Sequence, residues 1–198
     1  MELNNKQYKE PLELFTLWFD QAKTDDPDYH HGMSIATVNA KQEPSVRVVF
    51  LKEYDEQGFV FYTNYNSNKG NDLANNPNIC ANFWWKTRQR QVRISGVVSK
   101  VPNEQSDQYF HSRPRGSQLA AICSKQSQAI SSFNQLKENY EKIVDEHKNK
   151  TIDRPAHWGG YRIKANRIEF WQGLEHRLHH RLVFEMNGSD WHQHVIQP

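Results

Sequence analysis

The stretch Ser45-Val-Arg-Val-Val-Phe-Leu-Lys52 decides the fold class, because β-branched and aromatic residues fill it over a length typical of a strand. In a regular strand successive side chains point to opposite faces, so Arg47 shares a face with Val49 and Leu51 while Lys52 lies on the other. Two cations thus flank an apolar strand. They are either charges that keep an edge strand soluble or part of a site for an anion, and the strand alone leaves both interpretations open.

The segments around this strand repeat the period of two and are separated by short polar turns. We expect strands at residues 33–39 and 59–63, which together with residues 45–52 would form an antiparallel meander. Six further strands are expected, at residues 79–85, 90–100, 158–164, 167–171, 182–186 and 191–196. Asn187-Gly188 between the last two is a strong hairpin signal. This pattern predicts a mainly β protein with flanking helices and favours a barrel of antiparallel strands.

Helical patterns lie near the start of the chain and in one central segment. Pro11 can begin a helix, and apolar residues at helical spacing continue it until Asp25-Asp26-Pro27 stops it. Further helices are expected at residues 69–75, 103–109 and 116–123, and from Ser132, which would form a capping box with Gln135.

The length of 198 residues fits one domain, and 36% hydrophobic residues with six Trp supply enough material for a core. We expect a single domain over residues 1–198, with a short N-terminal arm at residues 1–10 and a helical insertion at residues 103–145. The 25 basic and 23 acidic side chains leave a net charge of only +2, which excludes a general affinity for nucleic acid or anionic membranes. Any anion must be bound locally.

Neither export nor a covalent framework is indicated. The N-terminal residues contain no apolar signal core, and no stretch approaches the roughly 18 uncharged apolar residues that span a bilayer, so a cytoplasmic protein is expected. Cys80 and Cys123 are far apart and form no CxxC pair, which argues against a disulfide framework or a thiolate zinc site. We expect two buried free thiols.

Two segments carry groups that suit phosphate. Tyr62-Thr63 closes a strand just before Ser67-Asn68-Lys69 opens a helix, and the first turn of a helix offers free amide donors to phosphate. In residues 109–117, Arg113 and Arg115 bring two guanidinium groups, which can bind phosphate through two hydrogen bonds at once. The alternative for this second segment is an ordinary helix end with solvated arginines, and the sequence leaves it equally open.

The densest group of functional side chains lies in residues 169–181, between two strands, where two arginines and three histidines fall within six positions. A metal site is disfavoured because no cysteine lies nearby and only one carboxylate, Glu175, adjoins these six positions, so an anionic heterocycle is the better guest. Histidine can exchange a proton near neutral pH or donate to a ring oxygen, while Arg177 and Arg181 can hold electron-rich edges of an aromatic ligand. A polar loop without function is the remaining alternative.

Taken in order, these stretches resemble the pyridoxine/pyridoxamine 5'-phosphate oxidases, a family of homodimeric FMN-binding split β-barrels. The resemblance extends from about Pro11 to Pro198 and rests on motifs that are weak singly and highly specific as an ordered set. The motifs are Arg47-Val-Val-Phe-Leu-Lys52, Phe61-Tyr-Thr-Asn64, Arg90-Gln-Val-Arg93, Tyr109-Phe-His-Ser-Arg-Pro-Arg-Gly-Ser117, Ser124-Lys-Gln-Ser127, Trp158-Gly-Gly-Tyr161, and Phe170-Trp-Gln-Gly173 with Arg177-Leu-His179.

The resemblance implies two phosphate-binding groups and a set of ring contacts. For FMN it implies contacts around the phosphate from Arg47, Lys69, Gln126 and Ser127, and contacts to the rest of the flavin from Tyr62, Thr63, Gln91, Trp171 and Arg181. For the substrate it implies phosphate contacts from Lys52, Tyr109, Arg113 and Ser117, with Lys52 also serving the cofactor. Arg177 and His179 are implied to be the catalytic residues that address the pyridine ring. No metal is implied.

The resemblance also implies the reaction. Pyridoxine or pyridoxamine 5'-phosphate would be oxidised to pyridoxal 5'-phosphate by hydride transfer to FMN, with O₂ as the final acceptor giving H₂O₂. Positioning would be the main catalytic contribution. Because the family's sites lie between subunits, a homodimer is expected to bring distant residues together. Two alternatives are a split-barrel flavin oxidoreductase with another substrate and a noncatalytic pyridoxal phosphate or flavin carrier.

Three features depart from the family's pattern. The N-terminal segment is short and lacks the family's basic, Tyr-containing arm. Asn68-Lys69 replaces an Arg-Lys pair near the FMN phosphate, which removes one charge-assisted contact worth about 1.5–3 kcal/mol, so FMN is expected to bind more weakly. His180 replaces an acidic residue, so Arg181 is expected to lack the ion pair that would fix it.

Overall fold

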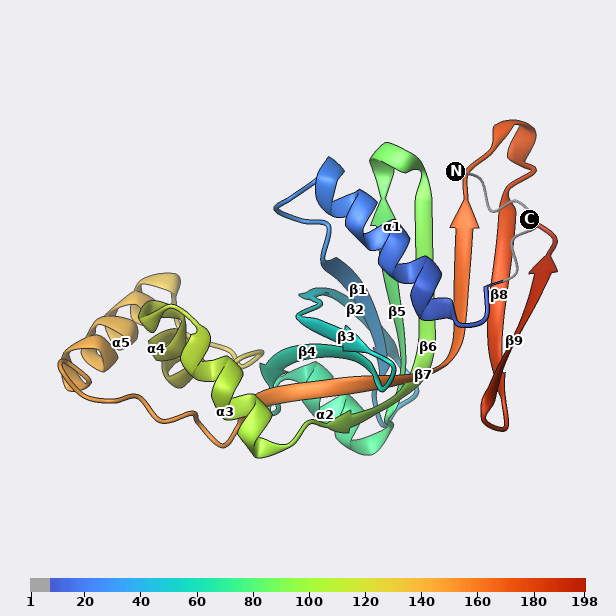
Figure 1. Ribbon diagram of the computed structural model, residues 1–198. Helices are drawn as coiled ribbons and strands as arrows, with labels where there is room; N and C mark the ends of the chain where they lie inside the picture. The colour runs from blue at the N-terminus through green and yellow to red at the C-terminus, as the bar shows by residue number, and fades with distance from the viewer. Residues whose placement is uncertain (1–7) are drawn as a thin grey trace.

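The computed structural model describes residues 8–198, so most of the expected N-terminal arm lies outside the described residues. Within residues 8–198, nine strands form one sheet in which neighbouring strands are antiparallel (Figure 1). The strands are β1 (Gly32–Val38), β2 (Pro44–Phe50), β3 (Glu53–Asp55), β4 (Gly58–Asn64), β5 (Asn78–Trp85), β6 (Arg90–Lys100), β7 (Trp158–Gln172), β8 (His180–Asn187) and β9 (Asp190–Ile196).

The sheet curls because one strand takes part in two sections of it. The strand order is β2-β1-β5-β6-β7-β4-β3, and β8 and β9 branch off from β7. The 15-residue β7 pairs with β4 along residues 158–163 and with β8 along residues 167–172. Figure 1 shows its first half running beneath the long strands and its second half rising between β6 and β8. The predicted mainly β barrel is confirmed as an open half-barrel with flanking helices.

The bend in β7 coincides with a β-bulge. The register of β6 against β7 shifts between Ser95 and Gly96, which leaves Asn166 as one extra residue on β7. Glycine is required at position 96, because a Cβ there would lie 2.2 Å from the carbonyl oxygen of Lys164. The two strands predicted in this region are therefore one strand with a bend.

One predicted pairing is wrong. β1 and β2 pair as expected, but β4 pairs with β7 and with the short β3, so the first three predicted strands do not form a meander. The period of two shows which side chains face the core. It does not show which strand lies alongside, because pairing depends on contacts between segments far apart in the sequence.

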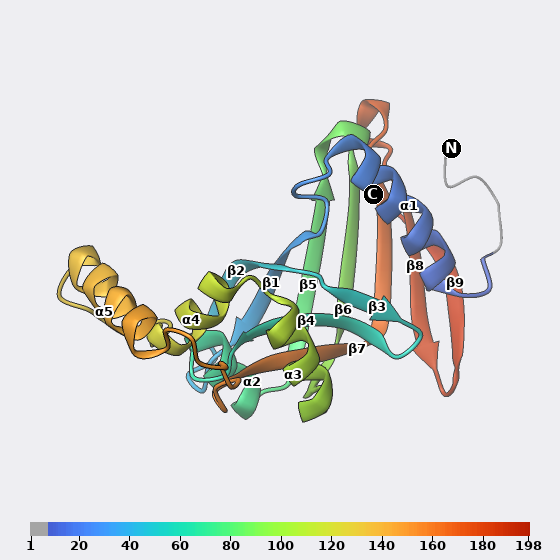
Figure 2. The same cartoon turned by 60° about the vertical axis from the view of Figure 1, so that its left-hand side comes forward.

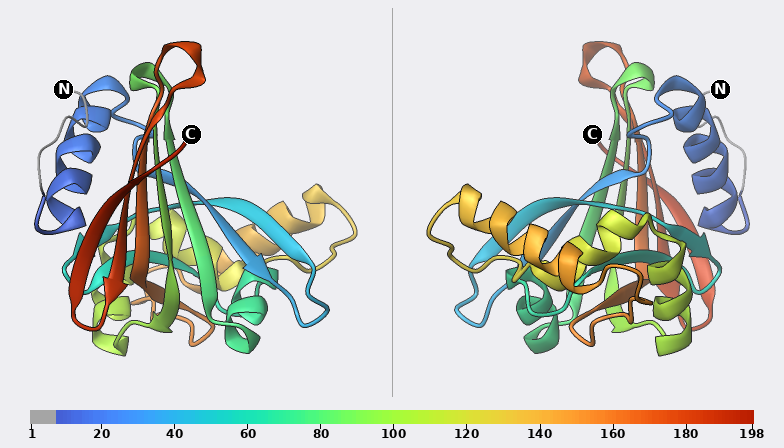
Figure 3. Two further views of the ribbon diagram at one scale, coloured as in Figure 1. Left: turned by 90° about the vertical axis from the view of Figure 1, so that its right-hand side faces the viewer. Right: turned by 90° about the vertical axis from the view of Figure 1, so that its left-hand side faces the viewer.

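The predicted helices are confirmed as α1 (Pro11–Asp25), α2 (Asn68–Asn75), α3 (Asn103–Ser112), α4 (Arg115–Cys123) and α5 (Phe133–Glu146). Helix α1 packs along the side of the long strands (Figure 3) and fills the open half-barrel with aromatic side chains. The Phe15 ring is fully buried and lies 4.9 Å from that of Phe59 and 5.5 Å from that of Phe83. Truncation of such a ring to Ala costs about 3–5 kcal/mol, so α1 is essential to the core.

Helices α3, α4 and α5 lie between β6 and β7 in the chain and project to one side of the sheet (Figure 2). The Oγ of Ser132 accepts a hydrogen bond from the Gln135 N–H and caps α5 as predicted. The Gln135 side chain contacts Glu138 and Asn139 instead of reaching back, so only half of the expected capping box forms. These helices share a second core, made of Phe110, Leu119, Ala121, Ile152 and Trp158.

Two further expectations concern the whole chain. Among the described residues, none of the helices combines the length and the apolar character needed to cross a membrane. Cys80 and Cys123 are free thiols as expected, but both are half-buried and not fully buried.

Candidate active site

A cleft of about 900 Å³ opens between β2, β4, helices α2, α3 and α4, and the loop after α4. We call it the cationic cleft. Ten of the expected site residues line it: Arg47, Lys52, Tyr62, Thr63, Lys69, Tyr109, Arg113, Ser117, Gln126 and Ser127. The other five, Gln91, Trp171, Arg177, His179 and Arg181, lie elsewhere in the described chain.

Lys69 forms one end of the cationic cleft. It sits in the first turn of α2, whose N-cap is Ser67. The Lys69 Nζ lies 3.0 Å from Thr63 Oγ1, 3.0 Å from Ser67 Oγ and 3.3 Å from Gln126 Oε1, all of them neutral acceptors. Burial, and then the charge of Arg47, lower the pKa of Lys69 to about 8. This buried cation with neutral partners fits a phosphate dianion as its counter-charge.

Arg47 reaches the same end of the cleft from β2. Its Nη1 donates to Thr37 Oγ1 at 2.7 Å, and its Nη2 lies 3.9 Å from the Asp72 carboxylate, to which Thr37 also donates at 2.6 Å. The opposite face of β2 carries Val46 and Val48, which are 66% and 63% exposed, as the strand alternation predicts. Arg47 is thus held by buried partners and is not a freely solvated edge charge.

Asn68 precedes Lys69 in α2 and also lines the cleft, with its side chain exposed. A neutral amide stands there, so the cations at this end are Arg47 and Lys69. Asn68, which replaces an arginine of the family's pattern, therefore stands where the missing charge would affect an anion bound in the cleft.

The other end of the cleft contains stacked aromatic rings. The Tyr62 ring lies nearly parallel to those of Tyr109, 3.9 Å away, and Trp158, 5.6 Å away. Gly160 permits this approach, because a Cβ there would lie 2.8 Å from the Tyr62 ring. The Tyr62 hydroxyl donates to Glu53 at 2.7 Å, and burial followed by this hydrogen bond raises the Tyr62 pKa. Tyr62 therefore remains a neutral phenol within the aromatic lining of the cleft.

Arg113 brings a half-buried cation to this aromatic end. Its guanidinium carbon lies 4.5 Å from the centre of the Trp158 ring, and its Nη1 is buried without a hydrogen-bond partner among the described residues. Buried polar groups normally have a partner, so this donor fits an anion bound in the cleft. Burial, and then the charge of Arg113, lower the pKa of Lys52, which also lines the cleft with Ser117. The cations of Lys52 and Arg113, together with the hydroxyls of Tyr109 and Ser117, suit a second phosphate.

Arg115 behaves differently from Arg113 although only Pro114 separates them. It is exposed, and its Nη2 donates to the carbonyl oxygens of His147 at 2.6 Å and Lys150 at 3.0 Å, near the end of α5. The alternative of an ordinary helix end therefore fits Arg115, while phosphate binding stays a prediction for Arg113. Arg113 faces the cleft, and Arg115 is an ordinary partner of helix-end carbonyls.

The five remaining residues lie on β6, β7, β8 and the loop before β8, on the side of the sheet away from the core. Gln91, Trp171 and Arg181 are direct cross-strand partners, and we call them the cross-strand row. The ring of His179 lies 4.6 Å from that of Trp171. The His179 Nδ1 accepts a hydrogen bond from the Leu174 N–H at 3.2 Å, so the neutral ring carries its proton on Nε2. His179 thus presents a donor.

Arg177 lies on an exposed turn beside this row. Its φ is 62° and that of His176 is 56°, both in the left-handed region that costs most residues about 1–2 kcal/mol. Ser127, at the edge of the cationic cleft, has a φ of 71°. Such strained residues concentrate at functional sites.

The expectation that Arg181 lacks an ion pair is wrong. Its Nε donates to Glu169 Oε1 at 2.8 Å, and its Nη2 lies 2.7 Å from the same oxygen. His180 precedes Arg181 on β8, and adjacent side chains of a strand point to opposite faces. The counter-ion therefore comes from the neighbouring strand β7 and not from the adjacent position in the sequence.

The contacts of Glu53 with Tyr62 and of Glu169 with Arg181 were not predicted. For Glu169 a signal exists, because it lies two positions before Trp171 in a predicted strand and so shares its face. For Glu53 no local signal exists, since its contact with Tyr62 depends on the pairing of β3 with β4, which joins Glu53 to Val60.

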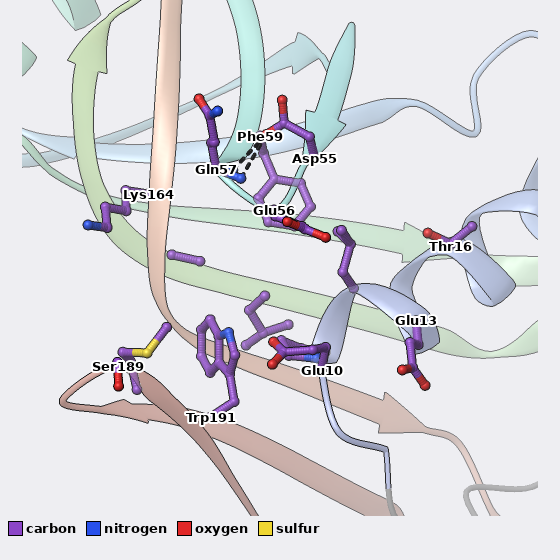
Figure 4. Close-up of a pocket in the computed structure, with 16 residues that line it drawn as sticks. Glu10, Glu13, Thr16, Asp55, Glu56, Gln57, Phe59, Lys164, Ser189 and Trp191 are labelled. Atoms are coloured by element: carbon purple, nitrogen blue, oxygen red, sulfur yellow. Dashed lines mark hydrogen bonds between the residues drawn. The ribbon is translucent and has the colours of Figure 1, made fainter.

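A second cleft, of about 770 Å³, lies between α1, the β3–β4 turn, β7 and the β8–β9 hairpin (Figure 4). Its walls carry carboxylates, among them Glu10, Glu13 and Glu56, around the Trp191 ring (Figure 4). This negative charge is unfavourable for a phosphate. The fifteen expected site residues are absent from its described lining, so the cationic cleft is the candidate site.

Comparison with solved structures defines the class of protein. The structure superimposes with a TM-score of 0.77, over 96% of this chain and 98% of the other, on a pyridoxamine 5'-phosphate oxidase-related, FMN binding protein from Nostoc punctiforme. At 12% identity this likeness concerns the fold alone, which is that of FMN-binding split-barrel proteins. PhzG from Burkholderia lata 383, solved in complex with tetrahydrophenazine-1-carboxylic acid, gives a TM-score of 0.92 at 25% identity, over 98% of this chain and 95% of that one.

Sequence comparison then defines the family. A model described as pyridoxamine 5'-phosphate oxidase matches residues 22–146, and one described as the pyridoxine 5'-phosphate oxidase C-terminal dimerisation region matches residues 158–198. The chain is 47% identical to the pyridoxine/pyridoxamine 5'-phosphate oxidase of Nostoc sp., over 95% of this chain and 88% of that protein. It is 43% identical to the protein of the same name from Leptospira biflexa, over 96% of this chain and 89% of that protein. The chain belongs to the pyridoxamine 5'-phosphate oxidase family.

Proposed function

We propose that this protein is an FMN-dependent oxidase that converts pyridoxine or pyridoxamine 5'-phosphate to pyridoxal 5'-phosphate. The observation that carries the proposal is the pair of separate cationic groups in one cleft. Lys69 with Arg47 forms one group and Arg113 with Lys52 the other. A reaction between two phosphorylated ligands, a flavin mononucleotide and a phosphorylated vitamer, requires two such groups. The names of the relatives at 43–47% identity support the same reaction.

In this proposal Lys69 and Arg47 hold the FMN phosphate, together with Gln126 and Ser127. The neutral hydroxyl and amide partners of Lys69 would orient its ammonium without competing for its charge. Tyr62 and Thr63 would continue the contacts toward the rest of the flavin, and Lys52, which also lines the cleft, would lie within reach of both ligands.

The substrate phosphate would bind at the aromatic end of the cleft. Arg113 would use its unpaired Nη1, with further contacts from Lys52, Tyr109 and Ser117. Tyr109 and Arg113 come from α3 and its C-cap, and Ser117 from α4, so the helical insertion over residues 103–145 would supply this part of the site. Within the proposal residues 1–198 act as a single domain.

FMN, when bound, supplies hydride acceptance and electron transfer on to O₂, which yields H₂O₂. The protein's own contribution is to orient the substrate ring. Neutral His179 presents an Nε2–H donor, which suits an oxygen on the pyridine ring, and Arg177 adds a permanent positive charge. Gln91, Trp171 and Arg181 would contact the flavin ring system.

We propose further that the active form is a homodimer in which each chain completes the site of the other. The cross-strand row belongs to another part of the sheet than the cationic cleft, and Trp171, Arg177, His179 and Arg181 lie within the matched dimerisation region. Large apolar side chains stand exposed beside both parts of the site, as an interface requires. They are Val46 (66%), Val48 (63%) and Phe50 (42%) on β2 and Trp84 (51%) beside Trp171.

The likeness to PhzG favours a second candidate, a flavin oxidase acting on a carboxylated aromatic ring system. The ordered phosphate-binding set of Lys52, Tyr109, Arg113 and Ser117 argues against it, since a carboxylate needs fewer donors than a phosphate. The identity of 25% to PhzG is also well below the 47% to the Nostoc oxidase.

The test is a peroxide assay on protein loaded with FMN. Pyridoxine 5'-phosphate or pyridoxamine 5'-phosphate should each give H₂O₂ and pyridoxal 5'-phosphate, and unphosphorylated pyridoxine should react far more slowly at the same concentration. A flavin-loaded protein that gives no peroxide with either phosphorylated substrate contradicts the proposal. Turnover confined to a reduced phenazine carboxylic acid would establish the second candidate.

A further inference from the structure

Glu169 is the most deeply buried carboxylate of the sheet, with only 1% of the residue exposed. Three arginines from three strands surround it. Its Oε1 accepts from Arg181 of β8, and its Oε2 accepts from Arg167 of β7 at 3.0 Å and from Arg93 of β6 at 3.5 Å. One carboxylate among three guanidinium groups leaves a net positive charge. Glu169 therefore orients this cluster without neutralising it.

The contacts fix the Arg181 guanidinium more tightly than a simple ion pair would. Its Nε lies 2.8 Å and its Nη2 2.7 Å from Glu169 Oε1, while its Nη1 donates to the Gln197 carbonyl oxygen at 3.1 Å. All three nitrogens are thus engaged. We call the paired contacts of Arg181 Nε and Nη2 with Glu169 the fork. Because Arg181 is the cross-strand partner of Trp171, the fork sets where the guanidinium stands in the cross-strand row.

The ionisation of Glu169 agrees with this role. Burial alone would raise the pKa of its carboxyl, but hydrogen bonds from Arg181 and Arg167, followed by the charges of Arg181 and Arg93, outweigh burial and lower it. The carboxylate is therefore charged at neutral pH, when it can accept from two or more arginines at once.

We propose that Glu169 is a positioning residue, which holds the Arg181 guanidinium in the orientation that contacts the bound flavin. The inference rests on the proposed function, in which Arg181 serves FMN. It adds a residue to the site that itself need not touch any ligand. Glu169 thus supplies the ion pair that the family's pattern assigns to an acidic residue at the position of His180.

Glu185 offers a matched control in the same network. It accepts from Arg167 Nε at 3.1 Å, is exposed, and makes no contact with Arg181 among the described residues. If any loss of charge near these arginines weakened FMN binding, Glu185→Gln and Glu169→Gln would act alike. The proposal requires that only the Glu169 variant does.

The experiment is a double-mutant cycle on FMN binding to the apoprotein, followed by quenching of flavin fluorescence. Glu169→Gln and Arg181→Ala should each weaken binding by about tenfold or more, the range seen when outer partners of metal ligands are removed. The double variant should be no weaker than Arg181→Ala alone, because Glu169 acts through Arg181. Losses that multiply, or a Glu169→Gln variant that binds FMN like the wild type, would overturn the proposal.

Two further variants keep the test decisive if Glu169→Gln folds poorly. Arg181→Lys keeps the charge but cannot form the fork, so it should weaken FMN binding nearly as much as Arg181→Ala; wild-type affinity in Arg181→Lys contradicts the proposal. Glu185→Gln should bind FMN normally. Failure of the proposed function would look different, because the FMN-loaded wild-type protein would then give no peroxide with either phosphorylated substrate, whatever the FMN affinities of the variants.

Discussion

The cationic cleft and the cross-strand row differ in how much of a ligand site a single chain can build. The cleft is enclosed by helices α2, α3 and α4, and it holds a buried lysine, Lys69, and a buried unpaired donor on Arg113. The row lies on one side of the sheet and continues into an exposed turn that carries Arg177. Under the proposed function, this difference means that one chain alone builds the phosphate anchors, while the ring contacts need a second surface opposite them.

The largest expected effect separates the two phosphate groups within the cleft. Arg113→Ala should raise the KM for pyridoxamine 5'-phosphate by about 10–150-fold, because a charged hydrogen bond of about 1.5–3 kcal/mol is lost. FMN affinity should stay nearly unchanged. Steady-state kinetics and an FMN titration of the same protein measure both. Arg115→Ala, which removes only contacts to helix-end carbonyls, is the control and should leave KM unchanged.

Lys69→Met should show the reverse pattern. FMN affinity should fall by about 10–100-fold, since the buried ammonium is the cation closest to the helix N-terminus of the cleft, whereas the KM of FMN-saturated enzyme should change little. Fluorescence titration gives the first value and kinetics at saturating FMN the second. Equal effects on both ligands would mean that the cleft is one undivided anion site.

The pH dependence of FMN binding should follow Lys69. Its pKa of about 8 in the free protein means that the ammonium is lost between about pH 7 and about pH 9, so FMN affinity should fall roughly tenfold over that interval. The Lys69 contribution to the free energy of unfolding has the opposite sign. Between about pH 8 and pH 10.5 Lys69 is protonated more often in the unfolded chain than in the folded one. Its contribution to the free energy of unfolding therefore rises with pH in this interval. An equally steep fall in Lys69→Met would refute the assignment.

The smallest expected effect is a gain. Asn68→Arg restores a cation beside Lys69 and should strengthen FMN binding by a few-fold, less than the full value of a charged hydrogen bond because the position is exposed. The same titration measures it. Asn71→Arg, on the same helix but outside the lining of the cleft, is the control. A gain of equal size at position 71 would indicate only a general charge effect.

The sequence predicted the strands, the helices and the cationic groups, because each follows from local chemistry. The alternation in residues 45–52 placed Arg47 on the same face as Val49, and the structure shows that this is the more buried face of β2. The pairing of β4 with β7 and the single bent β7 were not predicted, since they depend on the bulge at Asn166 and on partners far apart in the sequence.

The ion pair of Arg181 shows the same limit at the level of one residue. The sequence directed attention to position 180, the neighbour along the chain. In a strand that neighbour points to the other face, and the carboxylate that binds Arg181 stands across the sheet at Glu169. Site residues that act through cross-strand contacts become visible only when the register is known.

The central claim is that the cationic cleft of one chain works with the cross-strand row of another. It is tested most directly by mixing two variants, Arg113→Ala and His179→Ala, under conditions that allow subunit exchange. The assay uses substrate far below the KM of Arg113→Ala, where each variant alone is nearly inactive. Half of the dimers would be hybrids with one intact site of two, so activity should recover to about a quarter of the wild-type value. A mixture no more active than the mean of its two parents would contradict the claim.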